Sequence, residues 1–150
     1  MSFYQALAEF RYRIRGFLEF SQRAAAAAGL EPQQHQGLLA LRGLPRGLQP
    51  TIRTLAERLC IRHHSAVELV NRLARAGLVT RNHAPGDARV VLLRLTPRGE
   101  RLLDRLSRQH RAELRVAAPA LVRALQSVIA KPPVRARRPV RRPAHAKDKR

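Results

Sequence analysis

The sequence predicts a mostly helical domain that carries one small β-hairpin. Apolar residues recur at steps of three and four along most of residues 1–130, which is the period of amphipathic helices. Glycines and prolines separate these helical stretches from one another. Between residues 78 and 95 the helical period is replaced by two short extended runs on either side of a Pro-Gly turn. These three observations give the order of the elements.

The first predicted helix covers residues 3–28 and ends at Gly29, because glycine is common just past a helix end. One face of this helix carries a mostly apolar stripe at alternating steps of four and three residues: Phe3, Leu7, Phe10, Ile14, Phe17 and Ser21. Such a stripe packs either inside its own domain or against a partner helix in a dimer. We favour the dimer, because a small domain offers too little surface to cover the whole stripe.

Residues 32–77 predict three further helices. Pro32 suits the first position of a helix that runs through residue 41. Thr51 is a suitable N-cap for the next helix, which buries Ile52, Leu55, Ala56 and Leu59. After a turn at residues 60–63, the fourth helix runs from about residue 64 to 76 and ends at Gly77. Its buried face is predicted to be Ala66, Leu69, Val70 and Leu73.

The hairpin joins residues 78–82 to residues 90–95. Pro85 and Gly86 fit the second and third positions of a type II turn, whose third residue needs a positive φ. Thr96 and Pro97 then begin the last helix as an N-cap and a first-position proline. Its stripe is Leu102, Leu103, Leu106, His110, Leu114 and Ala117, continued by Leu121, Leu125 and Val128. We expect Pro119 to break or kink this helix.

The charge balance points to a polyanionic partner. Thirty Lys and Arg against ten Asp and Glu give the 150 residues a formal net charge of +20. A single cysteine, Cys60, forms neither an intrachain disulfide nor a cysteine-based zinc site, which favours an intracellular protein. No stretch approaches the roughly 20 apolar residues of a membrane span. We therefore expect a soluble cytoplasmic protein, associated with the nucleoid and not with a membrane.

The composition changes at residue 131. Residues 131–150 are rich in Arg, Lys and Pro and contain one acid, Asp148. Proline and like-charge repulsion predict a disordered basic tail. It is either an electrostatic arm along phosphates or a solubilising tail, and the sequence does not separate the two. The domain is thus expected at 1–130, with flanking helices at 3–30 and 97–130 and a DNA-binding part at 32–96.

The order of the elements is that of a winged helix-turn-helix. In that fold the third helix braces the fourth, which enters the DNA major groove, while the hairpin reaches sideways as a wing. The predicted buried face of the fourth helix leaves polar and basic side chains on its outer face: His64, Ser65, Glu68, Asn71, Arg72 and Arg75. All of these are able to make hydrogen bonds or charge contacts to DNA.

Residues 55–103 resemble the MarR family of bacterial transcription regulators. They read LAERLCIRHHSAVELVNRLARAGLVTRNHAPGDARVVLLRLTPRGERLL. The motifs are AGLVTR after the fourth helix, Asp87-Ala88-Arg89 in the wing, and Leu95-Thr96 followed by Gly99. The resemblance implies a homodimer on a pseudo-palindromic operator, commonly a repressor released by a small ligand or an oxidant. It also implies dimerisation through the first and last helices, for which the candidates are Phe3, Leu7, Phe10, Ile14, Leu121 and Leu125.

The resemblance assigns DNA contacts to two groups of residues. On the fourth helix the candidates are His63, His64, Ser65, Glu68, Asn71 and Arg72, and on the wing they are Arg81, Asp87 and Arg89. Arg89 is expected in or near the minor groove, since a narrow A·T-rich groove attracts arginine. Asp87 either pairs with Arg81 or Arg89, or is a turn residue only. Glu68 either contacts a cytosine amino group or completes a capping box with Ser65.

Other classes have less support in the sequence. No Ser/His/Asp or Cys/His pattern, phosphate-binding glycine loop or carboxylate pair indicates an enzyme, and no cofactor is implied. His63 and His64 lack the further ligands of a metal site. We interpret Cys60 as a small buried residue, although many such turns have a left-handed glycine there. The main alternative is a non-specific nucleoid- or RNA-associated basic protein. The operator, the effector and the choice between repression and activation are not evident in the sequence.

Overall fold

The structure, a computed structural model, describes residues 1–130. Within them, five helices and one hairpin follow in the order α1 (Phe3–Ala27), α2 (Pro32–Arg42), α3 (Ile52–Leu59), α4 (His63–Arg75), β1 (Val79–Ala84), β2 (Asp87–Leu95) and α5 (Pro97–Ile129). The predicted fold class is confirmed, with helix ends within one or two residues of those expected. The predicted tail at residues 131–150 lies outside the described residues.

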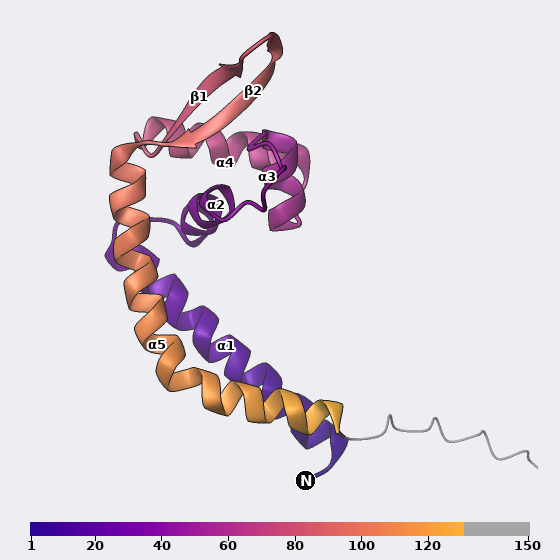
Figure 1. The fold of residues 1–150 in the computed structure, drawn as a ribbon. Helices are drawn as coiled ribbons and strands as arrows, with labels where there is room; N and C mark the ends of the chain where they lie inside the picture. The colour runs from indigo at the N-terminus through magenta and orange to yellow at the C-terminus, as the bar shows by residue number, and fades with distance from the viewer. Residues whose placement is uncertain (131–150) are drawn as a thin grey trace, which may run out of the picture.

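The described chain has two parts (Figure 1). The helices α2, α3 and α4 form a compact head, from which the hairpin extends. The helices α1 and α5 run side by side in opposite directions and form a long arm. The start of α1 therefore lies beside the end of α5, and the N-terminal part of α5 leads back to the hairpin.

The core lies where the arm meets the head. Its largest fully buried side chains are Leu38, Leu55, Leu69, Leu73, Leu78, Leu93, Leu106 and Val70. The predicted buried face of α4 is confirmed, because Ala66, Leu69, Val70 and Leu73 are all inaccessible to solvent. Gly37 lets α2 approach this face, since a Cβ there would lie 3.2 Å from Leu73 Cδ1. The packing therefore fixes which side of α4 faces outward.

Hydroxyl side chains cap two of the helices as predicted. Thr51 accepts a hydrogen bond from the Thr54 N–H at 3.1 Å at the start of α3. Thr96 accepts one from the Gly99 N–H at 3.1 Å at the start of α5. The Thr96 hydroxyl also donates to the Gly77 carbonyl at 2.7 Å, which ties the end of the α4 segment to α5.

Two local predictions were wrong. Ser65 does not cap α4, because that helix already begins at His63 with Arg62 as N-cap and without a side-chain capping bond. The proposed capping box with Glu68 is therefore absent from the described chain. Cys60 has the left-handed backbone of the usual glycine, with φ 53°, but its side chain is exposed rather than buried. A left-handed residue at the end of α3 turns its Cβ away from the core.

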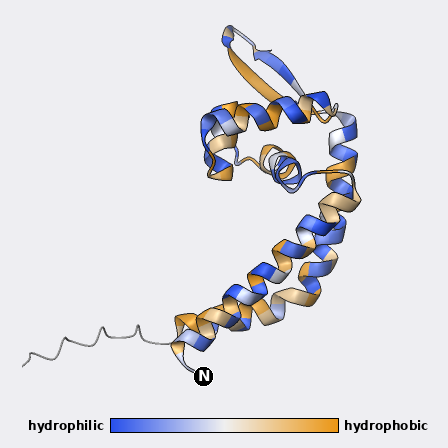
Figure 2. Ribbon diagram, turned by 180° about the vertical axis from the view of Figure 1, so that it is seen from behind, coloured by the Kyte–Doolittle hydropathy of each residue, from blue (hydrophilic) through white to orange (hydrophobic). Residues whose placement is uncertain are grey.

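The hairpin is antiparallel and closes at Gly86, whose φ is 83°. Its register pairs Val79 with Leu95 and Arg81 with Leu93. β1 is hydrophilic and β2 is hydrophobic in most of their length (Figure 2). The base of the hairpin is fastened to the head, because the Leu93 N–H donates to the Pro50 carbonyl at 2.7 Å. The tip is exposed and free to reach a partner.

The last helix does not break at Pro119. α5 continues through this residue to Ile129, although proline offers no N–H to the carbonyl of Arg115. The helix is bent along its length (Figure 1). None of the helices within residues 1–130 is long and apolar enough to cross a membrane.

Candidate nucleic-acid interface and ligand cavity

The outer face of α4 presents the polar residues expected to read DNA. His63, His64 and Glu68 are exposed, and Ser65 is half-buried. His63 and His64 lie in the first turn, where the backbone N–H groups and the positive end of the helix dipole favour a negative partner. The exposed Arg62 precedes them and was missed as a candidate. Arg62 could have been found from its position directly before the predicted fourth helix.

Asn71 joins α4 to the hairpin. Its Oδ1 accepts a hydrogen bond from the Arg81 guanidinium on β1. The Arg75 guanidinium bonds to the backbone carbonyl of Asn71 at 3.3 Å, one turn along α4. These contacts bring two of the predicted site residues, Asn71 and Arg81, into one group. They couple the orientation of the wing to that of the helix.

Arg72 faces inward toward α2 rather than outward. Its Nε lies 3.1 Å from Glu31 Oε2, and its Nη2 donates to Gln33 Oε1 at 2.9 Å. The Arg72 side chain is 30% exposed. Among the six residues predicted on α4, Arg72 is the one whose side chain bonds to residues of another helix segment of the head.

The tip of the wing holds an exposed arginine. The Arg89 side chain is 94% exposed, and its Nε lies 3.5 Å from Asp87 Oδ1. The same carboxylate oxygen accepts the backbone N–H of Arg89 at 3.0 Å. Asp87 thus both shapes the turn and pairs with Arg89, while Arg81 pairs with Asn71. At this exposure the ion pair is weak, and Arg89 is available to a stronger anion such as phosphate.

The residues predicted for dimerisation lie along the arm. Phe3, Leu7, Phe10, Ile14 and Leu121 are half-buried, and Leu125 is 40% exposed. The arm also exposes large apolar side chains that the prediction did not include: Met1, Tyr4, Tyr12, Val116, Val122 and Ile129. Hydrophobic residues are prominent near the end of the arm where α1 begins and α5 ends (Figure 2). The chain thus covers only part of its own arm.

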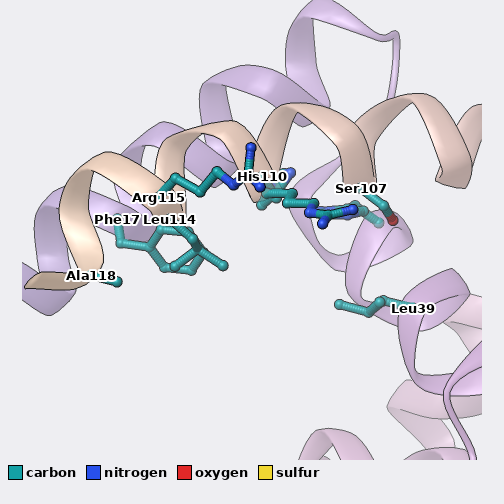
Figure 3. A pocket seen from close by; sticks show the side chains of 9 residues that line it. Phe17, Leu39, Ser107, His110, Leu114, Arg115 and Ala118 are labelled. Carbon is teal, nitrogen blue, oxygen red and sulfur yellow. The ribbon is translucent and has the colours of Figure 1, made fainter. Parts of the chain in front are cut away.

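A cavity of about 540 Å³ lies at the junction of the arm and the head. Three elements line it: α1 with Phe17, α2 with His35 and Leu39, and α5 with Ser107, His110, Arg111, Leu114, Arg115 and Ala118 (Figure 3). Most of its wall is apolar. The sequence did not reveal it, because its residues come from three segments far apart in the chain. One signal was present, since His110 interrupts the apolar stripe of the last helix.

Two histidines meet at the wall of the cavity. The rings of His35 and His110 have centroids 4.7 Å apart. His110 Nδ1 lies 2.7 Å from the Leu106 carbonyl, and its Nε2 lies 2.8 Å from Ser21 Oγ. His35 is only 2% exposed, and its Nδ1 has no hydrogen-bond partner within residues 1–130. Burial and the neighbouring His110 lower the pKa of His35 below its ordinary value of 6.5.

Within residues 1–130, no three His, Cys, Asp or Glu side chains cluster closely enough to hold a metal ion. The histidine pair accordingly lacks the further ligands that structural zinc sites use.

Residues 28–90 match the family model described as the MarR family. No curated protein matches the chain. The matched residues contain α2, α3, α4, β1 and the start of β2, and they therefore include α4 and the turn of the hairpin, where the candidate interface lies.

Solved structures resemble the chain over most of its length. A MarR family transcription regulator shares 25% identity with a TM-score of 0.70, over 84% of this chain and 84% of that one. The transcriptional repressor CouR bound to a 23-mer DNA duplex shares 26% identity with a TM-score of 0.60, over 79% and 87%. CouR from Rhodococcus jostii RHA1 bound to p-coumaroyl-CoA shares 22% identity with a TM-score of 0.63, over 88% and 97%. The family match over residues 28–90 and these structures agree: the chain resembles the MarR family of transcription regulators and shares their winged helix-turn-helix fold.

Proposed function

We propose that this protein is a homodimeric regulator that recognises a specific DNA sequence with α4 and the hairpin. The observation that carries the proposal is the bond between Asn71 on α4 and Arg81 on β1. It joins the polar face of α4 to the wing, so that both present one surface to a duplex. A major groove admits one helix, and the flanking hairpin then reaches the next stretch of backbone or minor groove.

The proposed base contacts come from the outer face of α4. His63, His64, Ser65, Glu68 and Asn71 offer donors and acceptors to base edges there. Arg62 adds a positive charge beside the first turn. Arg72 supports the helix from its inner side through Glu31 and Gln33. Its contribution to DNA binding is therefore indirect.

The proposed wing contact is made by Arg89. A long exposed cation at a hairpin tip suits the enhanced negative potential of a narrow A·T-rich minor groove. Asp87 shapes the turn that carries Arg89 through the backbone bond at 3.0 Å, and the weak ion pair at 3.5 Å leaves the guanidinium available to DNA. Arg81 ties β1, the first strand of the wing, to α4 through its bond to Asn71.

We propose that two copies join through their arms. The exposed apolar side chains at the end of the arm belong to both α1 and α5, so a second arm packed there would remove them from water. The half-buried stripe of Phe3, Leu7, Phe10 and Ile14 borders the same region. A dimer with twofold symmetry would place two copies of α4 on successive major grooves of a palindromic site.

We further propose that the protein is a repressor that a small molecule releases from DNA. The cavity at the junction of arm and head supports this, because an occupant there would change the angle between them and with it the spacing of the two α4 helices. The relative bound to p-coumaroyl-CoA and the one described as a repressor on DNA are consistent with such a function. The basic residues 131–150 would add affinity for any duplex.

The alternative is a protein that binds nucleic acid without sequence preference. The formal net charge of +20 favours it. Such a protein does not need the mixed His, Ser, Glu and Asn surface of α4, and for that reason we rank it second.

The test is a set of alanine variants measured on one native operator. Arg89→Ala should weaken binding by about 1–3 kcal/mol, and His64→Ala should reduce the preference for the operator over a shuffled duplex. Arg23→Ala is the matched control, because Arg23 is an exposed arginine on the arm. If Arg89→Ala and His64→Ala bind both duplexes as the unmodified protein and the control do, α4 and the wing are not the DNA-binding surface.

A further inference from the structure

The first turns of α5 carry an arginine stripe. Arg98, Arg101, Arg105 and Arg108 follow one another at steps of three, four and three residues, so they lie on one side of the helix. All four residues are exposed. At a rise of about 1.5 Å per residue, the stripe is roughly 15 Å long. It is a basic surface outside the predicted DNA contacts on α4 and the wing.

The charge of the arginine stripe is not neutralised within the described chain. Among residues 1–130, none of the four guanidinium groups forms an ion pair. Two acids lie in the same part of α5. Glu100 is bonded to Arg42 on α2, with 3.0 Å between Oε2 and Nε, and Asp104 is exposed. The four arginines therefore keep most of their charge available to an outside anion.

The neighbouring end of α1 adds neither acids nor bulk to this surface. It consists of five alanines, Ala24–Ala28. Ala28, Leu102 and the first three arginines of the stripe border a hollow of about 310 Å³ there, and within the described chain no Asp or Glu lines it. Because the alanine side chains are short, a protruding anionic strand is able to approach the arginines closely.

The arginine stripe begins at the base of the hairpin. Arg98 Nη1 donates to the Ala76 carbonyl at 3.1 Å, at the end of α4. Thr96, directly before α5, donates to the Gly77 carbonyl at 2.7 Å. From there α5 runs along the arm, away from the hairpin (Figure 1). The stripe therefore starts at the edge of the proposed DNA-binding surface and extends from it along the arm.

The surface around the stripe fits a nucleic-acid backbone better than a protein partner. The exposed large apolar side chains of α5 begin at Leu114 and continue to Ile129, beyond the stripe. A protein partner needs an apolar centre with a polar rim, and residues 97–113 expose no large apolar side chain that would form one. A nucleic-acid backbone needs only cations along its phosphates, since the release of counterions supplies sequence-independent affinity. Arginine suits this task, because its planar guanidinium binds phosphate through two N–H groups.

We propose that the arginine stripe of α5 binds the phosphodiester backbone of the DNA that flanks the operator. This inference rests on the proposed function and adds a second contact surface to it. α4 and the wing hold the protein at its site, and the stripe then holds the next stretch of the same duplex. The duplex bends toward the arm to follow the stripe, since α5 leads away from the hairpin (Figure 1). The stripe thus contributes affinity that depends on the length of the duplex and not on its sequence.

The test compares a short and a long duplex, both titrated with the full chain. The short duplex contains the operator palindrome alone, and the long one adds about one helical turn, roughly ten base pairs, on each side. Each is titrated at several salt concentrations, and each is also made with a shuffled operator. We expect the slope of log affinity against log salt to be steeper on the long duplex, because each phosphate that the stripe contacts adds about 0.9 to it.

Two double variants locate the effect. Arg101→Gln/Arg105→Gln should reduce the slope on the long duplex by about two, or about one for each arginine, and leave the short duplex unchanged. Arg11→Gln/Arg23→Gln is the matched control, since it removes the same charge from exposed arginines of α1. Residues 131–150 are present in every variant, so their contribution cancels in the comparison.

The inference is overturned if the stripe variant and the control lose the same slope on the long duplex, or if neither loses any. An equal loss on the short duplex overturns it as well, because the contact then lies within the operator. A stripe variant that weakens on a double-stranded RNA of the same length but not on DNA would make the stripe an RNA-binding surface instead. Equal affinity of the unmodified protein for operator and shuffled duplexes contradicts the proposed function and not this inference, since the stripe variant still lowers the slope on both long duplexes.

Discussion

Arg72 on α4 is joined to Glu31 at the start of α2, with 3.1 Å between Nε and Oε2. His35 lies one turn further along α2, at the wall of the cavity. The same short helix therefore contacts both the proposed DNA-reading helix and the proposed ligand. A displacement of α2 by a ligand would reach α4 through this ion pair and through the packing of Gly37 against Leu69 and Leu73.

The first prediction separates support from DNA contact at Arg72. Arg72→Ala should lower the free energy of unfolding by up to about 1 kcal/mol, because water screens an ion pair of this exposure. Its effect on operator affinity should be smaller than that of Arg89→Ala. Urea unfolding and a DNA-binding titration measure the two quantities. A larger loss of affinity than at Arg89, with unchanged stability, would make Arg72 a direct contact.

The second prediction concerns the arm. Leu125→Glu should convert a dimer to monomers, because it places a charge among the apolar residues at the end of the arm. Leu125 is preferable to Leu7 or Phe10, which are half-buried within the single chain. Sedimentation velocity measures the association state. Gln22→Glu, at an exposed position on α1, is the control. A Leu125→Glu variant that remains dimeric would place the interface elsewhere.

The third prediction concerns the strained turn before α4. Cys60 has φ 53° and ψ 41°, a conformation that costs a non-glycine residue roughly 1–2 kcal/mol. Cys60→Gly should raise the free energy of unfolding by about 0.5–1 kcal/mol, after the larger entropy of the unfolded glycine chain is subtracted. Cys60→Val should lower it, since a β-branched residue fits this region poorly. Thermal unfolding distinguishes them, and a destabilised glycine variant would refute the account.

The fourth prediction compares two glycines. A Cβ on Gly99 would lie 2.3 Å from the Leu78 carbonyl oxygen, whereas one on Gly16 would meet nothing within 4 Å. Gly99→Ala should therefore destabilise the protein by about 1–3 kcal/mol, because the start of α5 must move away from the Leu78 backbone. Gly16→Ala should stabilise α1 by about 0.5–1 kcal/mol. Equal stability of the two variants would show that α5 does not need its close approach to Leu78.

The fifth prediction is the pH dependence of stability without a ligand. The pKa of His35 is lower in the folded than in the unfolded chain, where it is near 6.5. The unfolded chain therefore binds the proton first as the pH falls below about 6.5, and stability is lost until the lowered pKa is passed. His35→Leu should reduce this loss and raise stability at pH 7.5. Urea unfolding at pH 7.5 and 5.5 tests it, and an unchanged acid loss would exclude His35 as its cause.

Local signals predicted most of the fold. The caps at Thr51 and Thr96 and the turn at Gly86 depend on neighbouring residues, and periodicity alone identified the buried face of α4. The start of α4 was misplaced by one residue, which was enough to suggest a capping box that is absent from the described chain. The sequence predicts a buried Cys60, because free cysteines are usually buried. The residue type does not indicate where the side chain points when the backbone is left-handed, and in the structure Cys60 is exposed.

The features of the site that depend on tertiary contacts could not be predicted from the sequence. Arg72 looks like an outward residue by helical spacing, and only the packing of α2 beside α4 reveals its pairing with Glu31. The cavity requires Phe17, His35 and His110 to converge from three helices. The DNA contacts, the dimer interface and the tail remain predictions.

A salt titration of DNA binding tests the central claim most directly. The full chain is titrated onto the duplex found upstream of its own coding region and onto a shuffled duplex of the same composition, at increasing salt. Phosphate contacts weaken on both duplexes as salt rises, whereas base contacts are specific to one. We predict that the native duplex stays preferred, on the order of 10³-fold or more. Equal affinity for the two duplexes at every salt concentration would contradict sequence recognition by α4 at this site and favour the non-specific alternative.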